Sequence, residues 1–407
     1  MGRRVCRQAM MHGFDNKEKF LESFEPDKSQ CRLIENRYQE LCDKWKQRSA
    51  NQLKSEKNFF LEQVNLKKYS RLKARGEAIN LKGKYKLKQS EIEAFENDGI
   101  LGPFPLLDAA EAKRLYELSL RYHESAFDED FLLGLDVKHA LKRKESWSIN
   151  YSGLFQALKH RELWDMVCRP EITDRLACLL GDDIIAWRTQ FFQRRSGDNG
   201  TFWHQQGTFK ETSANPKLVP TLDIHHGMVQ LTVWVALTDV RQDNGCMRFL
   251  PGSYADGRME YFMSHLEDKL HLLLHDRDEA FIRGVLKILL FSPGTFLKAQ
   301  IGYELARKEI PDLLDDYRVE NIEMKAGEFI IFSSLNMHAS FPNTSTDDRL
   351  AFAVRYTTND VKVYPDFEQD FFASPEGNIP FSVRDIGCIQ ARGADKYSYN
   401  RMASNLE

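Results

Sequence analysis

Two histidines stand in segments of the sequence where a metal ion could be bound. A predicted strand ends at Arg194, a turn follows at 196–200, and His204 lies on the next predicted strand. His338 starts another predicted strand. Arg349 opens a further strand after a polar loop. Each residue alone is as readily explained by a structural role, since an isolated histidine is more often hydrogen-bonded or exposed than a ligand. Together they match a site for iron and a 2-oxoacid, because two histidines, usually with one carboxylate, bind non-heme iron and a guanidinium grips a carboxylate through two hydrogen bonds.

The strands that would carry these residues are short and lie in the second half of the chain. Glycine, asparagine and aspartate turns separate strand-like runs at 184–188, 189–194, 229–237, 247–250, 328–332 and 350–356. This pattern predicts a β-sandwich or jelly roll. Helical periodicity at 109–122 and 170–180 predicts helices that buttress its outside. The predicted fold class is therefore α+β, with a double-stranded β-helix, or jelly roll, as its core.

The distribution of charge divides the chain into two predicted parts. The 407 residues carry a formal net charge of -3, but residues 1–90 hold 22 Lys and Arg against 11 Asp and Glu. Spaced apolar residues in this basic part are typical of amphipathic helices. We expect a basic helical extension at 1–85, packed on a catalytic domain at 86–407 whose first helix has Ser90 as its N-cap. Docking of the extension on an acidic partner protein is the minor alternative.

Composition excludes several classes of protein. The sequence contains no run of about 18 apolar residues, the length that a membrane span requires. The N-terminal stretch also lacks the apolar core of a signal peptide. The seven cysteines are scattered and include no Cys-x-x-Cys pair, which suits reduced thiols rather than a zinc cluster or a disulfide framework. We therefore expect a cytoplasmic protein with neither a membrane nor a nucleic acid as its partner.

Several longer motifs resemble those of the phytanoyl-CoA dioxygenase superfamily, and within it those of the aliphatic non-heme iron halogenases of natural-product biosynthesis. The similarity extends from about residue 92 to residue 400. Its motifs are Cys168-Arg-Pro-Glu-Ile-Thr-Asp-Arg, Trp187-Arg-Thr-x-Phe-Phe, Trp203-His-Gln, Leu231-Thr-Val-Trp-Val-Ala-Leu-Thr, Asn244-Gly-Cys-Met-Arg-Phe-Leu-Pro-Gly-Ser, Met324-Lys-Ala-Gly-Glu-Phe-Ile-Ile-Phe, Met337-His-Ala-Ser and Val363-Tyr-Pro-Asp. The resemblance implies a cupin-like oxidoreductase that uses Fe(II), 2-oxoglutarate and O2.

The resemblance also implies roles for individual residues. His204 and His338 would bind the iron, and Arg355 would lie near the oxo-acid and any halide. Arg349 would hold the distal carboxylate of 2-oxoglutarate, with help from Thr201, Thr232 and Trp234. The strand pattern alone favours core packing for Thr232 and Trp234, whereas their place in a matched motif favours cofactor binding.

Gln206 departs from the pattern of the family. It stands two residues after the first histidine, where hydroxylases of the superfamily have Asp and halogenases have Ala or Gly, which leaves room for chloride on the iron. A neutral glutamine is a weak ligand at best, and if it turns away the position stays open to halide or water. A shift of one residue would bring Gly207 to this place, and Asp198 and Asp223 are alternative carboxylates outside the expected spacing.

Three functions therefore stay open at the level of the sequence. By the resemblance, oxidative decarboxylation of 2-oxoglutarate would give an Fe(IV)-oxo species that removes hydrogen from an aliphatic carbon. Capture of halide is the leading hypothesis, and hydroxylation is the rival because Gln206 fills the place of the halide. A binding module that has lost the metal is the third. The expected substrate is a small amino-acid-like molecule, free or tethered to a carrier protein, under a lid formed by 254–322.

Overall fold

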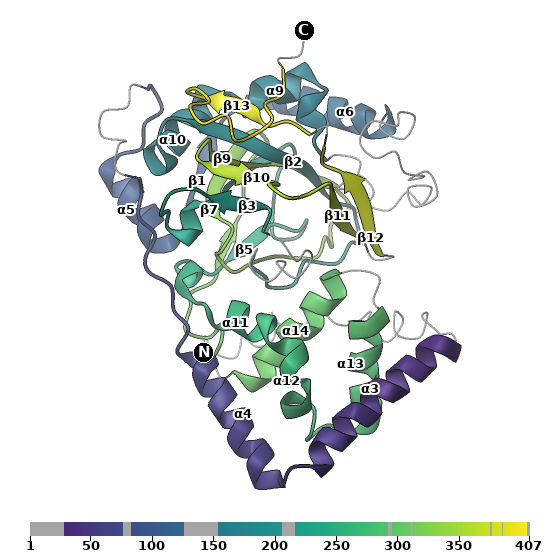
Figure 1. Cartoon of the computed structure of the whole chain (residues 1–407). Helices are drawn as coiled ribbons and strands as arrows, with labels where there is room; N and C mark the ends of the chain where they lie inside the picture. The colour runs from purple at the N-terminus through teal and green to yellow at the C-terminus, as the bar shows by residue number, and fades with distance from the viewer. Residues whose placement is uncertain are drawn as a thin grey trace.

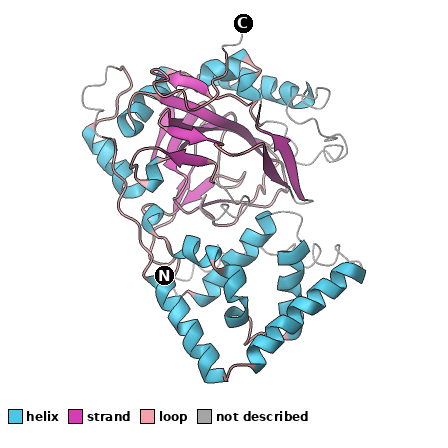
Figure 2. Cartoon of the chain, viewed as in Figure 1, coloured by secondary structure: helices cyan, strands magenta, loops and turns pink. Residues whose placement is uncertain are grey.

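The computed structural model describes residues 28–75, 83–125, 154–205, 216–291, 295–310, 312–374, 377–384 and 386–404. Figures 1 and 2 show a region of strands with helices on its outside and, beside it, a second region built of helices alone. No helix in the described part of the chain is long and apolar enough to cross a membrane.

The six-stranded antiparallel sheet is the larger of the β layers. Its strand order is β1-β7-β4-β9-β2-β13. These strands are β1 (Ile100–Pro105), β2 (Ile184–Arg194), β4 (Leu231–Ala236), β7 (Glu328–Ser333), β9 (Arg349–Thr358) and β13 (Ile389–Arg392). The two runs predicted at 184–188 and 189–194 are one strand, because a bulge and not a turn separates them. The pairing moves from Ala186↔Tyr356 to Arg188↔Arg355, which leaves Trp187 as the extra residue.

A smaller sheet covers the inner face of the large one. It has the order β6-β5-β8 and consists of β5 (Met247–Phe249), β6 (Glu320–Ile322) and β8 (His338–Ser340). Trp234 and Ala353 of the large sheet share an apolar cluster with Phe249 of the small sheet. The α+β prediction is confirmed, and the two antiparallel sheets across a common core agree with a jelly roll.

The described residues also form two short strand pairs and three single-turn helices. β3 (Leu218–Pro220) pairs with β10 (Val361–Val363), and β11 (Gln369–Ser374) pairs with β12 (Gly377–Ser382). The 3-10 helices are η3 (Gln156–Leu158), η5 (His226–Met228) and η6 (Ser253–Ala255).

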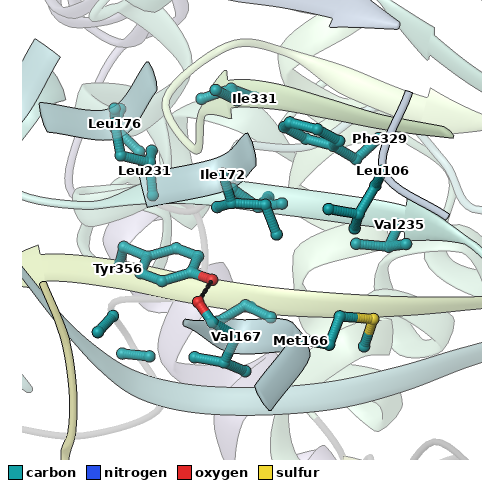
Figure 3. Close-up of a cluster of buried hydrophobic side chains, with 14 of the residues drawn as sticks. Leu106, Met166, Val167, Ile172, Leu176, Leu231, Val235, Phe329, Ile331 and Tyr356 are labelled. Atoms are coloured by element: carbon teal, nitrogen blue, oxygen red, sulfur yellow. Dashed lines mark hydrogen bonds between the residues drawn. The ribbon is translucent and has the colours of Figure 1, made fainter. Parts of the chain in front are cut away.

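Helices cover the outer face of the large sheet, as the sequence predicted. They are α6 (Ala109–Ser125), α9 (Arg161–Val167) and α10 (Pro170–Leu180), and α10 has the predicted bounds. Figure 3 shows Ile172 and Leu176 of α10 against Leu231 of the sheet. The buried hydroxyl of Tyr356 donates to the carbonyl of Val167 at 2.8 Å. Because side chains alternate along a strand, the other face of the same strands is left to line the interior.

The helix before β1 begins earlier than predicted. α5 (Gln89–Asp98) has Lys88 as its N-cap, so the assignment of Ser90 to this position was wrong. The carboxylate of Glu91 accepts a hydrogen bond from the Lys88 N–H at 2.7 Å, which satisfies one of the unpaired donors at the helix start. At the other end Gly99 adopts a φ of 68°, a left-handed conformation that glycine tolerates, and the chain enters β1 directly.

The basic N-terminal stretch forms two of the predicted amphipathic helices, α3 (Lys28–Lys46) and α4 (Ala50–Asn65). They pack on the segment predicted as a lid, which contains α11 (Arg258–Ser264), α12 (Leu266–Leu273), α13 (Glu279–Phe291) and α14 (Thr295–Glu309). Phe60 lies 5.8 Å from Phe262 between ring centroids, and the indole of Trp45 donates to the carbonyl of His271 at 2.6 Å. The helices of the two segments, distant in sequence, lie side by side (Figure 1). Their buried side chains share one apolar core. The domain boundary at residue 86 stays a prediction.

Candidate metal and cofactor site

The backbone brings His204 and His338 side by side. His338 is the first residue of β8, as predicted, whereas His204 lies outside the named strands and joins His338 through an isolated β-bridge. The N–H of His204 donates to the carbonyl of His338 at 3.0 Å, and the N–H of His338 donates back at 2.9 Å. The centroids of the two imidazole rings are 4.2 Å apart. A pair of main-chain hydrogen bonds thus fixes two potential metal ligands against each other.

Each imidazole is oriented by a backbone carbonyl two residues earlier. His204 Nδ1 lies 2.9 Å from the Phe202 oxygen, and His338 Nδ1 lies 2.7 Å from the Asn336 oxygen. A carbonyl only accepts, so both Nδ1 atoms carry the proton and both Nε2 atoms carry a lone pair. Metal-binding histidines usually hold their tautomer in this way, by donating the second ring N–H to a carbonyl or carboxylate.

Aromatic rings and nearby cations keep both histidines neutral. Phe332 and Phe249 lie 5.4 and 5.8 Å from the His338 ring, measured between centroids. Burial lowers the pKa of His204 to about 4, and the positive charge of Arg194 acts in the same direction. Burial, the neighbouring His204 and the charge of Arg355 hold the pKa of His338 well below its usual range. A neutral imidazole is the form that binds a metal ion.

The low pKa of His204 predicts that the metal-free protein loses stability in acid. The folded pKa is about 4 against about 6.5 in the unfolded chain, so below pH 6.5 the unfolded state binds a proton that the folded state does not. The contribution of His204 to the free energy of unfolding is intact above pH 6.5 and decreases as the pH falls. The decrease stops near pH 4, where the folded state also takes up the proton. Between pH 7 and pH 5 we expect a loss of about 2 kcal/mol from this residue.

Urea unfolding of the metal-free chain at pH 7 and pH 5 measures this effect. The matched variant is His204→Asn, which keeps a polar side chain of similar size but cannot take up the proton. The difference in unfolding free energy between the two pH values should be smaller in the variant by about 2 kcal/mol. An identical pH dependence in both proteins would contradict the prediction.

Arg349 forms a buried cationic end of the site. It is the first residue of β9, as predicted, and only 3% of it is exposed. In the part of the chain that the structure describes, its buried Nε has no hydrogen-bond partner, and no ion pair to a carboxylate offsets its burial. Its guanidinium lies 5.2 Å from the centroid of the Trp234 ring. Burial, followed by the like charge of Arg194, lowers the pKa of Arg349 to about 9.

Arg194 stands beside Arg349 and connects it to Thr201. The two arginines are cross-strand partners in the β2–β9 pair, and Arg194 Nη2 donates to the hydroxyl of Thr201. Arg194 Nε is also buried without a partner among the described residues. Two adjacent buried cations with unmet donors are costly, because removing a charge from water is offset only by an opposite charge and hydrogen bonds. Their geometry therefore suits an anion such as a carboxylate.

Arg355 and Thr232 lie at the other end of the histidine pair. They are cross-strand partners in the β4–β9 pair, and Arg355 Nη1 donates to Gln190 Oε1 at 3.3 Å. The Thr232 hydroxyl is 2.9 Å from that of Ser334. Arg355 is close enough to His338 to lower its pKa, whereas Arg194 acts on His204. The histidines thus lie between the Arg349 end and the Arg355 end.

The third candidate ligand, Gln206, and its neighbour Gly207 lie outside the described residues. Asp198 belongs to the turn before His204, where its carboxylate accepts from the Arg195 N–H at 2.6 Å, and Asp223 is exposed. Within the described ranges no group of three or more His, Cys, Asp or Glu side chains could hold a metal ion. The histidine pair is therefore not joined there by a carboxylate.

The residues present fit an iron(II) ion with a 2-oxoacid. Two imidazole nitrogens with lone pairs form part of the ligand set of non-heme iron sites, and the orphaned donors of Arg349 and Arg194 fit the far carboxylate of the oxo-acid.

The sequence interpretation missed Arg194 and Arg188 as site residues. A signal was available: Arg188 and Arg194 are six residues apart, and so are Arg349 and Arg355. An even spacing within a strand places side chains on one face, so each pair should line the same interior. The antiparallel register then sets Arg194 opposite Arg349 and Arg188 opposite Arg355.

Comparisons with known proteins agree with this geometry. The model of the phytanoyl-CoA dioxygenase (PhyH) family matches residues 95–351, more than half of the chain. The solved structure described as CytC3 with Fe(II) and alpha-ketoglutarate is 26% identical, with a TM-score of 0.51 over 78% of this chain and 93% of that one. A second structure of CytC3 is 25% identical over the same shares, with the same TM-score. The comparison with curated protein sequences gave no match.

Proposed function

The chain belongs to the phytanoyl-CoA dioxygenase family, and from this premise we propose that it is an Fe(II)- and 2-oxoglutarate-dependent enzyme that halogenates an unactivated aliphatic C–H bond. The core would be a closed double-stranded β-helix. The similarity to CytC3, whose structure contains Fe(II) and alpha-ketoglutarate, supports this choice of cofactors. Iron and 2-oxoglutarate would supply the oxygen-dependent oxidation that removes a hydrogen atom from the substrate.

The observation that carries halogenation is the absence of a carboxylate beside the histidine pair in the described part of the chain. An iron site with two neutral ligands keeps an open coordination position and a positive charge. A halide would fill the open position and reduce the positive charge. The residue in the family's third-ligand position, Gln206, is uncharged and competes less well for the metal than Asp would.

The chain's own residues would hold and align the reactants. His204 and His338 would bind the iron through Nε2, with their rings fixed by the Phe202 and Asn336 carbonyls. Arg349 would bind the distal carboxylate of 2-oxoglutarate against the Trp234 face, and Thr201 would support that carboxylate through its contact with Arg194. Thr232, which lies opposite Arg355, would line the other end of the site. The aromatic rings around His338 would exclude water from the reacting centre.

Hydroxylation is the second candidate, favoured by the length of the Gln206 side chain, whose amide oxygen could reach the position that a halide needs. In either case we propose a small amino-acid-like substrate, free or tethered to a carrier protein. Helices α11–α14 would cover it, and α3 and α4 would support that cover because they share its core.

Chloride binding distinguishes the two reactions without knowledge of the substrate. The full chain is loaded anaerobically with Fe(II) and 2-oxoglutarate, and its visible charge-transfer band is recorded during a chloride titration. Wild type and Gln206→Ala should show a saturable shift of the band, whereas Gln206→Asp should show none because its carboxylate occupies the position. A panel of L-amino acids is then added, followed by O2 and mass analysis of the products.

A chlorinated product that requires chloride would support halogenation. Hydroxylation would be correct if wild type holds iron and 2-oxoglutarate, its band ignores chloride, and only hydroxylated products form.

A further inference from the structure

A second buried group of charged residues lies at the Arg355 end of the interior. The carboxylate of Asp370 is fully buried and receives three donors: Lys217 Nζ at 2.6 Å, Tyr364 OH at 2.7 Å and Arg188 Nη1 at 3.1 Å. We call Arg188, Lys217, Tyr364, Arg355 and Asp370 the Asp370 cluster. No role in binding iron or 2-oxoglutarate requires Arg188, Lys217 or Asp370.

The β-bulge in β2 turns Arg188 toward the interior. Upstream of the bulge the residues of even number, such as Ala186, pack in the helix-facing core with Tyr356. The extra residue Trp187 shifts the register, so that Arg188 pairs with Arg355 instead. Bulges re-aim side chains in this way and occur often beside functional sites.

A row of cross-strand neighbours connects the Asp370 cluster to the metal ligands. Arg188 lies opposite Arg355, Arg355 opposite Thr232, and Thr232 opposite Phe332. The Phe332 ring is 5.4 Å from that of His338. Adjacent strands are about 4.8 Å apart, so about 14 Å of sheet separates the backbones of Arg188 and Phe332. The cluster is thus within the length of a small molecule from the histidine pair, on the side away from Arg349.

The cluster carries more positive than negative charge. Among the described residues its three cations, Arg188, Lys217 and Arg355, face a single carboxylate, that of Asp370. Arg188 is 9% exposed and its buried Nε has no partner there. Its guanidinium lies 5.8 Å from the ring centroids of both Phe155 and Phe381, which fix its position without satisfying its N–H groups. An ion pair that served only to join two strands would need one cation, not three.

We propose that the Asp370 cluster binds a free carboxylate of the substrate and so selects small organic acids over carrier-tethered acyl groups. This inference rests on the proposed function, because it assigns the substrate of the same site. The forked guanidinium of Arg188 would pair with the two oxygens of the carboxylate, and Lys217 would add a second positive charge. An acyl group joined to a carrier as a thioester has lost this charge and would leave the cations unpaired.

Calorimetric binding to the full chain loaded with Ni(II) and 2-oxoglutarate tests the inference, since Ni(II) prevents turnover. The probes are butanoate, hexanoate and octanoate, each compared with its primary amide. At least one carboxylate should bind wild type about tenfold or more tightly than its amide, as expected for an added charged hydrogen-bonded pair. Arg188→Met and Lys217→Met should reduce this ratio to below about threefold, and Arg241→Met, which changes a surface arginine, should leave it unchanged.

Retention of 2-oxoglutarate by each variant shows that its site is folded and separates the two proposals. If wild type fails to bind Ni(II) and 2-oxoglutarate, the proposed function is wrong. If wild type binds Ni(II) and 2-oxoglutarate but binds each carboxylate and its amide with equal affinity, the proposed carboxylate site is wrong. The same holds if it binds Ni(II) and 2-oxoglutarate but none of the carboxylates or amides. Three further results would overturn the carboxylate site. Hexyl phosphate could bind more tightly than hexanoate, or chloride could compete with hexanoate at equal concentration. The third result is an unchanged ratio of carboxylate to amide affinity in Arg188→Met.

Discussion

Replacing His338 by alanine is expected to abolish stoichiometric iron(II) binding. His338 and His204 are the paired imidazoles whose protonated Nδ1 atoms leave both Nε2 atoms as donors to a metal. Loss of a residue that merely orients a ligand lowers metal affinity about 10- to 100-fold, so loss of a ligand itself should cost more than about 100-fold. His204→Ala should have the same effect, because one imidazole cannot hold the ion.

Anaerobic iron titration with equilibrium dialysis measures the loss, and thermal unfolding checks that each variant is folded. His225→Ala is the matched control, since both ring nitrogens of His225 are engaged by the backbone: Nε2 lies 2.9 Å from the Ser70 oxygen and Nδ1 accepts from the Gly227 N–H at 3.1 Å. It should bind one iron per chain like wild type. Full iron affinity in His338→Ala would contradict the assigned site, and a wild type that takes up no iron would favour the non-catalytic binding module.

Replacing Arg349 by methionine is expected to raise the dissociation constant of 2-oxoglutarate by about 100-fold or more while iron still binds. Truncating one partner of a buried charge pair costs about 2–5 kcal/mol, and each 1.4 kcal/mol is tenfold in affinity. The structure adds a second, opposite effect. Without an anion the Arg349 guanidinium is buried beside Arg194 and has no ion-pair partner among the described residues. The metal-free variant should therefore be at least as stable as wild type.

Two measurements test the prediction for Arg349 together. Titration of 2-oxoglutarate into the anaerobic iron-loaded protein gives the affinity, and urea unfolding of the metal-free protein gives the stability. Arg349→Lys should recover only part of the affinity because it restores the charge without the fork. Arg241→Met should change neither quantity. A large loss of stability in Arg349→Met would assign Arg349 a structural role and contradict its function as an anion ligand.

The strand starts at His338 and Arg349 were predictable from the sequence, whereas the predicted strand at His204 was wrong because an isolated bridge holds this residue. His338 and Arg349 begin β8 and β9, where the polar turns before each apolar run predicted strand starts. Helix α10 has its predicted bounds because Pro170 fits the first turn and Gly181 follows the last one. These features depend on interactions between residues close in sequence, such as turns, caps and alternating burial, which a local pattern records.

Contacts between distant segments were not predictable in the same way. The Trp187 bulge is one example: a single extra residue changes which side chain of β2 faces Arg355, and the apolar pattern of the strand gives no sign of it. The packing of α3 and α4 on α11–α14 is another, since an amphipathic helix shows that it has a buried face but not what covers that face.

The sequence by itself thus determined the kinds of residue available for chemistry and the local elements that carry them. It determined two histidines, two arginines at an even spacing on β9, and an uncharged Gln206 after His204. Only the tertiary structure decided that the imidazoles lie 4.2 Å apart, that Arg194 stands beside Arg349, and that Asp370 joins Arg188 to Lys217. The physical reason is that strand register and sheet packing are set by the burial of side chains from the whole chain, whereas caps and turns are set by neighbours.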